Sequence, residues 1–188
     1  MTVHEFAHGW VAYKRGDTTA KYSGRLTLNP LAHIDIFWTI LLPLFLFIST
    51  QGSFIFGAAK PVPINYRALK NPKRDIILVG ASGPAANFVL AALVGMVIRL
   101  IPLNELIFFL AQHLILINII LGVFNLIPIP PLDGSRILFG LLPNDMARGL
   151  ARIEPYGFFI VIALIWLGLF NRIIWPMVSI IYRILVRA

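Results

Sequence analysis

Two histidines and a glutamate stand together at the start of the chain, in the run His4-Glu5-Phe6-Ala7-His8. Residues four apart in a helix share one face, so the two imidazoles would project side by side, with a carboxylate next to them. In hydrolases, such a pair binds zinc while the glutamate acts as a general base. The run therefore predicts a zinc-dependent hydrolase with Glu5 as its catalytic residue. The alternative is a surface helix with two unrelated histidines.

The composition is that of a membrane protein. Hydrophobic residues make up 59% of the 188 residues, and the mean hydropathy is +0.84, which excludes an ordinary soluble domain. The length suits a single membrane-embedded domain over residues 1–188. Cysteine is absent, so a metal would be held by histidine and carboxylate groups. The net charge of +8 lies beside apolar segments, which favours anchoring to anionic lipid over binding of nucleic acid.

The hydropathy pattern predicts an all-α polytopic protein, a transmembrane helix bundle with short β segments. Alternation predicts a strand at 24–28, and prolines keep 60–64 extended. The predicted apolar helices are 1–13, 76–101, 105–127 and 156–170, while 128–155 holds short amphipathic helices and 173–186 spans, dips into or lies on the membrane. A helix over 1–13 is only about 20 Å long. We therefore expect the first helix to be truncated, with an apolar half-helix upstream of it.

A catalytic zinc takes three protein ligands, so His4 and His8 need a third partner. The favoured candidate is Asp133, which follows the end of an apolar helix and a proline-rich run and precedes Gly134, a residue that permits a sharp turn. The alternative is that Asp133 caps a helix starting near Gly134. His33 and Asp35 are the runner-up metal groups, as partners of a ligating imidazole or as a satisfied interfacial pair. His113 is predicted to be a helix-packing histidine.

A parity argument concerns residues 31–56. If Asp133 meets the two histidines, the helix 105–127 must end on the membrane face where the first helix ends. The preceding helix 76–101 must then start on that face as well, so the segment 31–56 must enter and leave by it. We therefore predict a re-entrant hairpin, bent near Pro43, at the active-site face. The alternative is that 31–56 spans the membrane. Segments 14–30, 57–74 and 128–155 carry four, five and three Lys or Arg, whereas the opposite turn, from Pro102 to Glu105, has none. This bias predicts that the active site is near the cytoplasmic face.

These motifs together resemble the site-2 protease family of intramembrane zinc metalloproteases. The resemblance rests on the first histidine run, on Asn125-x-x-Pro128-x-x-Pro131-x-Asp133-Gly134 and on Gly83-Pro84-Ala85-Ala86-Asn87. It also rests on 24–30 and on Lys60-Pro61-Val62-Pro63, which resemble a compact prokaryotic branch. The chain shows no PDZ or CBS module, so the regulation of relatives that carry one is not transferred.

The resemblance implies one Zn2+ per chain, with His4, His8 and Asp133 as ligands and Glu5 as general base. Asn125 and Asn87 are candidates for binding substrate or oxyanion, with a structural hydrogen bond between helices as the alternative for Asn125. The implied function is an intramembrane zinc metalloendopeptidase of the cell membrane that cleaves the transmembrane helix of another membrane protein. Segments 24–28 and 60–65 would accept substrate as an added strand, or simply protect an edge. The oligomeric state is left open.

Two other functions are compatible with parts of this pattern. A catalytically inert membrane scaffold of the same fold would not need Glu5. A metal transporter would need polar residues repeated through several spans, and the apolar segments here have few.

Overall fold

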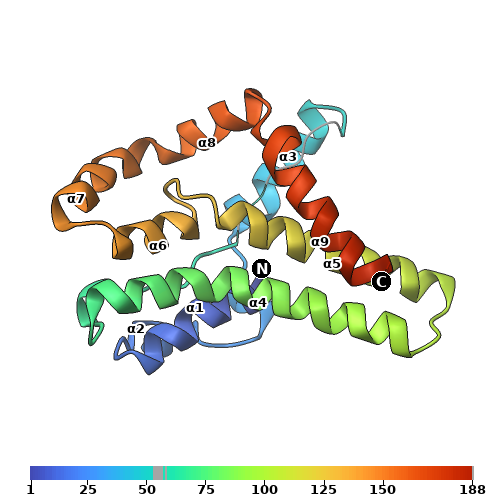
Figure 1. Cartoon of the computed structure of the whole chain (residues 1–188), viewed down its shortest axis with the longest axis horizontal. Helices are drawn as coiled ribbons and strands as arrows, with labels where there is room; N and C mark the ends of the chain where they lie inside the picture. The colour runs from blue at the N-terminus through green and yellow to red at the C-terminus, as the bar shows by residue number, and fades with distance from the viewer. Residues whose placement is uncertain (53–56, 58, 188) are drawn as a thin grey trace.

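The computed structural model describes residues 1–52, 57 and 59–187 (Figure 1). Within these residues the secondary structure is helical throughout, which confirms the predicted all-α class. The α-helices are α1 (Thr2–Lys14), α2 (Thr19–Tyr22), α3 (Leu42–Ser49), α4 (Pro72–Leu100), α5 (Glu105–Asn125), α6 (Asp133–Leu141), α7 (Asn144–Ile153), α8 (Gly157–Trp166) and α9 (Trp175–Arg187). Short 3-10 turns are η1 (Pro30–His33), η3 (Tyr66–Ala68) and η4 (Glu154–Tyr156), and π-helical turns are η2 (Ile36–Leu41) and η5 (Phe170–Ile174).

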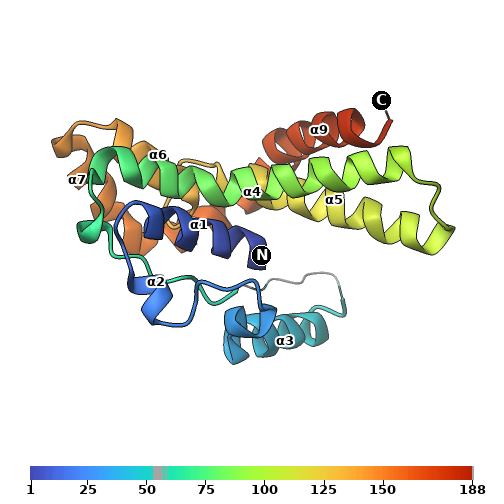
Figure 2. The same ribbon diagram turned by 90° about the horizontal axis from the view of Figure 1, so that it is seen from below.

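Helix α4 is the central element, because α1, α5, α6 and α9 all pack against it. In Figure 2 it runs through the molecule with α1 along one side and α5 returning beside it. The hydrophobic core lies where α4 meets α5 and the C-terminal helices, at Ala91, Ile115, Ile119, Ile174 and Val178. The other half of α4 contacts α1 and α6 instead, and those two helices carry the polar motifs.

Three helices in the described part of the chain are long and apolar enough to cross a membrane: Pro72–Leu100, Glu105–Asn125 and Asn144–Trp166. The first two agree with the predicted helices. The third begins earlier than the predicted 156–170, because α7, η4 and α8 follow one another directly. Helix α9 has 13 residues, which is short of the roughly twenty needed to span a bilayer, and it packs against α5.

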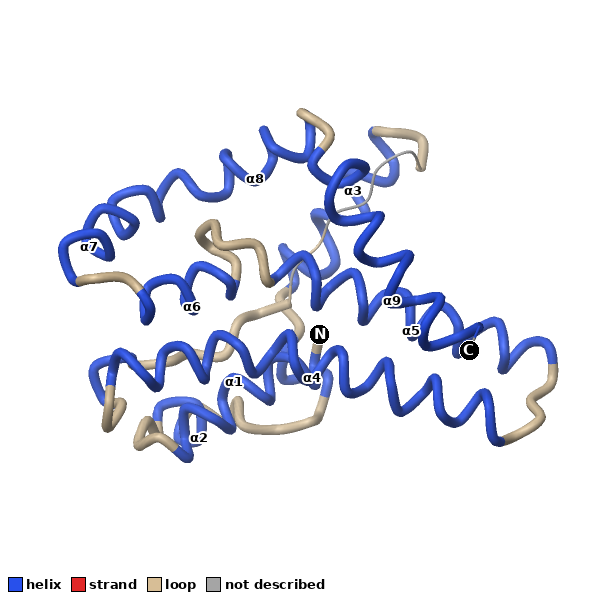
Figure 3. The backbone as a smooth tube through the Cα atoms, viewed as in Figure 1, coloured by secondary structure: helices blue, strands red, loops and turns tan. Residues whose placement is uncertain are grey.

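The prediction of short β segments is wrong for the residues described. Residues 24–28 form a turn and bends, and 60–65 have no regular secondary structure, as the loops of Figure 3 show. The backbone of the first segment is satisfied locally: Arg25 N–H donates to Ala20 O, and Thr27 O is bonded by the ring of His33. Gly24 lies at a φ of +66°, so the chain turns there. The alternating pattern had no partner strand to pair with.

The apolar segment after His33 also differs in detail from its prediction. Helix runs without interruption over Ile36–Ser49, with the π-helical turn η2 passing directly into α3 just before Pro43. The bend near Pro43 is therefore wrong, and the chain turns instead at Gln51 and Gly52, both with positive φ. Part of the return, residues 53–56 and 58, lies outside the described residues.

The two ends of this segment are hydrogen-bonded to each other. Lys60 N–H donates to His33 O at 2.9 Å, and Asn65 N–H donates to Asp17 Oδ2 at 2.7 Å. Lys70 N–H donates to Arg15 O at 2.9 Å. The chain thus comes back to the place from which it left, while Ile36–Ser49 stands apart from the other helices (Figure 2).

Close packing of α6 on α4 depends on glycine. A Cβ on Gly140 would lie 2.2 Å from Ile77 Cγ1 and 2.5 Å from Lys73 O, both of α4, whereas one on Gly149 of α7 would meet nothing within 4 Å. We expect Gly140→Ala to lower the free energy of unfolding by about 1–3 kcal/mol because α6 must shift. Gly149→Ala is the matched control, and it should leave stability unchanged or raise it, since alanine favours helix. Thermal unfolding in detergent measures both, and equal melting temperatures would contradict the prediction.

Candidate metal centre

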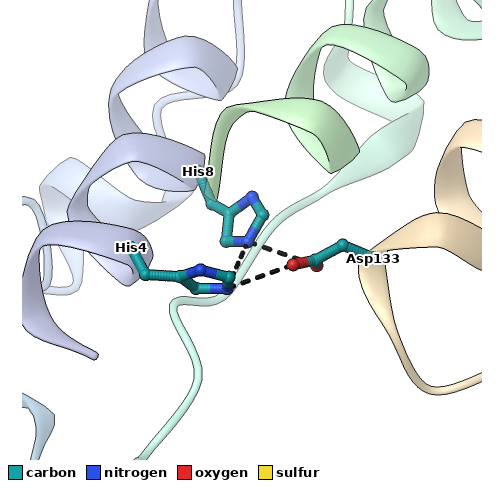
Figure 4. A group of neighbouring side chains, drawn as sticks. All are labelled: His4, His8 and Asp133. Atoms are coloured by element: carbon teal, nitrogen blue, oxygen red, sulfur yellow. Dashed lines mark hydrogen bonds and ion pairs between the residues drawn. The ribbon is translucent and has the colours of Figure 1, made fainter. Parts of the chain in front are cut away.

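Three side chains that lie far apart in the sequence, two from α1 and one from α6, meet in one cluster (Figure 4). His4 Nε2 lies 3.1 Å from Asp133 Oδ2, His8 Nε2 lies 3.2 Å from Asp133 Oδ1, and the two Nε2 atoms are 3.1 Å apart. Both histidines are buried, at 5% and 6% exposed. The structure therefore brings together the three residues that the two sequence motifs singled out.

Helix α1 presents the histidines one turn apart, and α4 forms the wall behind them. A Cβ on Gly83 would lie 2.3 Å from His8 Nε2 and 2.6 Å from His4 Cε1, so the rings occupy the space that a side chain would need. His8 Nδ1 lies 2.7 Å from Val79 O, one turn earlier on α4. If Nδ1 carries the hydrogen and donates it there, the Nε2 lone pair is free to face the cluster.

His4 is contacted by another residue of α4, Asn87. Asn87, which is fully buried, places its amide Nδ2 3.1 Å from His4 Nδ1. Its oxygen has no hydrogen-bond partner. Asn87 thus touches the imidazole itself and lies behind it, on the side away from Asp133. The predicted contact of Asn87 with substrate or oxyanion stays a prediction.

Asp133 is the first residue of α6, and its carboxylate makes no capping hydrogen bond to that helix. The capping alternative is therefore wrong, since the side chain points at the histidines (Figure 4). Burial raises the pKa of this carboxyl, but hydrogen bonding to His4 and His8 outweighs burial and lowers its pKa below the ordinary value. Gly134 has no positive φ; it is needed because a Cβ would lie 2.2 Å from Leu126 O.

Glu5 lies in the same cleft, which has a volume of about 340 Å³ and is lined by the three clustered residues. One carboxylate oxygen, Oε2, accepts a hydrogen bond from Val62 N–H at 2.9 Å. Val62 belongs to the irregular segment between two prolines that the sequence marked as extended. This contact could not be predicted from the sequence, because every residue except proline has a backbone N–H and the residue type therefore does not reveal which one binds Glu5.

The rim of the cleft adds one predicted residue and two that sequence reasoning missed. Asn125 lines it, with its amide donating to Leu121 O of its own helix at 2.9 Å, so the alternative of a bond to a neighbouring helix is not what is seen. Arg136, one turn after Asp133, also lines the cleft, lies over the ring of Tyr66 and pairs with Glu154. Burial raises the pKa of the Tyr66 hydroxyl.

The runner-up metal groups stay outside the cluster. The His33 ring bonds to Thr27 O at 2.9 Å, and Asp35 caps the following helix by accepting from Phe37 N–H and Trp38 N–H. His113 is exposed and bonds within its own helix, to Phe109 O. The prediction that it packs between helices is therefore wrong.

Comparison with known proteins identifies the family. "Putative zinc metalloprotease YwhC" from Bacillus subtilis is 39% identical over 95% of this chain and 82% of its own length. The family model described as "Peptidase family M50" matches residues 101–168, which include Asn125 and Asp133. The chain belongs to this family. Membership confirms the resemblance to the site-2 proteases and makes the chain a zinc metalloprotease associated with membranes.

Other relatives in the family are longer. Rip2 from Mycolicibacterium smegmatis, also named as a putative zinc metalloprotease, is 32% identical over 92% of this chain and 65% of its own length. Rip2 from Mycobacterium tuberculosis H37Rv is 30% identical over 87% of this chain and 62% of its own length. This chain therefore spans somewhat under two thirds of Rip2. No solved structure gives a significant match.

The cluster fits the zinc that the family implies. Each of the three residues offers one ligand atom, and these atoms all lie within 4.8 Å of one another, close enough to hold a single ion of the kind that histidine and carboxylate groups bind. Asp133 Oδ2 is buried and lies 3.1 Å from His4 Nε2, so the oxygen and the imidazole nitrogen can face the same cation. The donor set of two imidazoles and one carboxylate leaves a fourth position for water.

Gly83 should be required for metal binding. A methyl group at this position overlaps both imidazoles, so we expect Gly83→Ala to displace them and reduce bound zinc at least tenfold. Gly95→Ala on the same helix is the control, because the three atoms nearest to its Cβ all belong to Leu185, at 3.1 Å or more, and Gly95 lies twelve positions along α4 from Gly83. Zinc is measured by mass spectrometry on protein purified in detergent. Full zinc content in Gly83→Ala would show that the rings are not held against α4.

Proposed function

We propose that this member of the family is an intramembrane zinc endopeptidase that hydrolyses peptide bonds within or near a transmembrane segment of another membrane protein. The observation that carries the proposal is the position of Glu5 beside a three-ligand cluster in one cleft. The proposal assigns one zinc per chain to His4, His8 and Asp133. An inert scaffold would have no use for a carboxylate at the position of Glu5.

Each residue of the cleft has a distinct part in the proposed reaction. The chemistry that a bound zinc supplies is a lowered pKa of a coordinated water and polarisation of the substrate carbonyl. Glu5 accepts the proton of the attacking water and passes it to the leaving amine nitrogen. Val62 N–H holds one oxygen of Glu5, which fixes the carboxylate and leaves the second oxygen for the water. Asn125, on the rim, donates its remaining amide hydrogen to the substrate backbone.

The substrate must be unwound where it is cut, because the carbonyls of a helix are occupied by its own hydrogen bonds. The segment 60–65 runs along the cleft through Pro61, Val62 and Ile64. Since Pro61 and Pro63 have no N–H, this segment offers few donors to an added strand, and its main contribution is to hold Glu5. The substrate is proposed to lie in extended form between this segment and α6.

The proposed topology is a cell-membrane protein with the cleft near the cytoplasmic face and a re-entrant segment after His33. The hydrogen bonds that join 15–33 to 60–70 support it, since both ends of the segment then lie on one face. The excess of Lys and Arg in 14–30, 57–74 and 128–155 supports the cytoplasmic assignment. The apolar helix Ile36–Ser49 is shorter than a full span, as a re-entrant element would be.

Separate variants distinguish metal binding from proton transfer. We expect about one zinc in wild type and in Glu5→Gln, and much less in Asp133→Ala, which loses a ligand. Wild type should cleave a transmembrane substrate, and phenanthroline should abolish that cleavage. Because Glu5→Gln lacks the general base, its cleavage rate should be about 10²–10⁴ times lower than that of wild type. Zinc by mass spectrometry and cleavage in detergent are the measurements; zinc retained by Asp133→Ala would remove its role as ligand.

Cysteine labelling tests the topology without removing any native thiol, because the chain has no cysteine. Single cysteines are introduced at three exposed positions, Lys21, Arg67 and Pro102. With a re-entrant segment, a membrane-impermeant maleimide added to intact cells should label Pro102→Cys and neither of the others. All three should be labelled after permeabilisation. Opposite behaviour of Lys21→Cys and Arg67→Cys would show that the segment between them spans the membrane.

A further inference from the structure

The group that faces His4 Nδ1 is a side-chain amide, which can either donate or accept a hydrogen bond. Asn87 is fully buried in α4, its amide lies 3.1 Å from His4 Nδ1, and its other end has no partner. His8 has a backbone carbonyl, Val79 O, at the equivalent ring nitrogen. A carbonyl can only accept, so it suits one protonation form of its histidine. An amide can accept through oxygen or donate through nitrogen.

The two forms of His4 require opposite partners at Nδ1. A histidine that gives its Nε2 lone pair to a metal carries its hydrogen on Nδ1, so the neighbour of Nδ1 must accept. When Nε2 instead carries the hydrogen and donates it to Asp133 Oδ2, at 3.1 Å, Nδ1 is a lone pair and its neighbour must donate. A half-turn of the Asn87 amide exchanges its oxygen and nitrogen and serves both forms.

We propose that Asn87 is a positioning residue for the metal centre, which presents its amide oxygen to His4 Nδ1–H when the metal is bound and its amide nitrogen when it is not. This inference rests on the proposed role of His4 as a zinc ligand. It assigns Asn87 a part that differs from substrate binding. The orphaned end of the amide in the present arrangement is consistent with a group that must be free to turn over.

Two substitutions separate the accepting role from simple packing. Asn87→Leu keeps the volume and removes both hydrogen-bonding groups, so zinc affinity should fall about 10- to 100-fold. Asn87→Asp can only accept when ionised, and a carboxylate on Nδ1–H strengthens the basicity of the ligand. Its zinc affinity should therefore be equal to that of wild type or higher. If Asn87 only filled space, zinc affinity would not fall with leucine and be kept with aspartate, since both side chains are of similar size to asparagine.

The experiment measures zinc affinity by competition with a chelator, in detergent, for wild type, Asn87→Leu and Asn87→Asp. Asn118→Leu is the matched control, because Asn118 is another buried helical asparagine, whose amide donates to Leu114 O of its own helix. It should bind zinc like wild type. Elution as a single species and a melting temperature close to that of Asn118→Leu show that each variant is folded.

The affinity order decides the inference. The inference is supported if wild type and Asn87→Asp bind zinc tightly and Asn87→Leu binds it weakly. Asn87→Leu within about twofold of wild type would overturn it, and so would Asn87→Asp as weak as Asn87→Leu, which would show that the amide acts as a donor. Cleavage is not part of this measurement. A chain that binds zinc with the expected order and yet cleaves nothing would refute the proposed function and leave the role of Asn87 standing.

Discussion

The close approach of two imidazoles to the bare backbone of α4 is the constraint on which the rest of the site depends. At Gly83 the rings of His4 and His8 fill the place of a side chain, and at Gly80 a Cβ would lie 3.0 Å from the backbone oxygen of Asp133. These two glycines are one helical turn apart, so a single face of α4 receives both α1 and α6. The cluster forms because two helices share one glycine-lined wall.

The sequence predicted the membership of the cluster and most of the helices. Spacing alone put His4 and His8 on one face, and the proline-rich run before Asp133 marked a chemically unusual acid. Their roles at the metal are still predictions. The β segments failed because alternation over 24–28 does not by itself supply the neighbouring strand that a strand must pair with. The bend predicted at Pro43 failed because a π-helical turn leads directly into α3 there and the helix continues through the proline.

Other parts of the site could not be predicted because their signal is not carried by residue type. Val62 acts through its amide N–H and Val79 through its carbonyl, and any residue other than proline has both groups. Arg136 did follow Asp133 at helical spacing, so its position one turn along the same face could have been noticed. Its pairing with Glu154 depends on how α6 and η4 meet, which is a tertiary property.

The distance in sequence between the ligands has a thermodynamic consequence. His8 ends the first motif and Asp133 begins α6, so an ion held by both joins segments about 125 positions apart. Such an ion acts as a cross-link that closes most of the chain into one loop, and an unfolded chain has no preformed site to compete for it. If the proposed ligands hold zinc, metal occupancy is linked to the integrity of the whole bundle, and the protein is less stable without the metal.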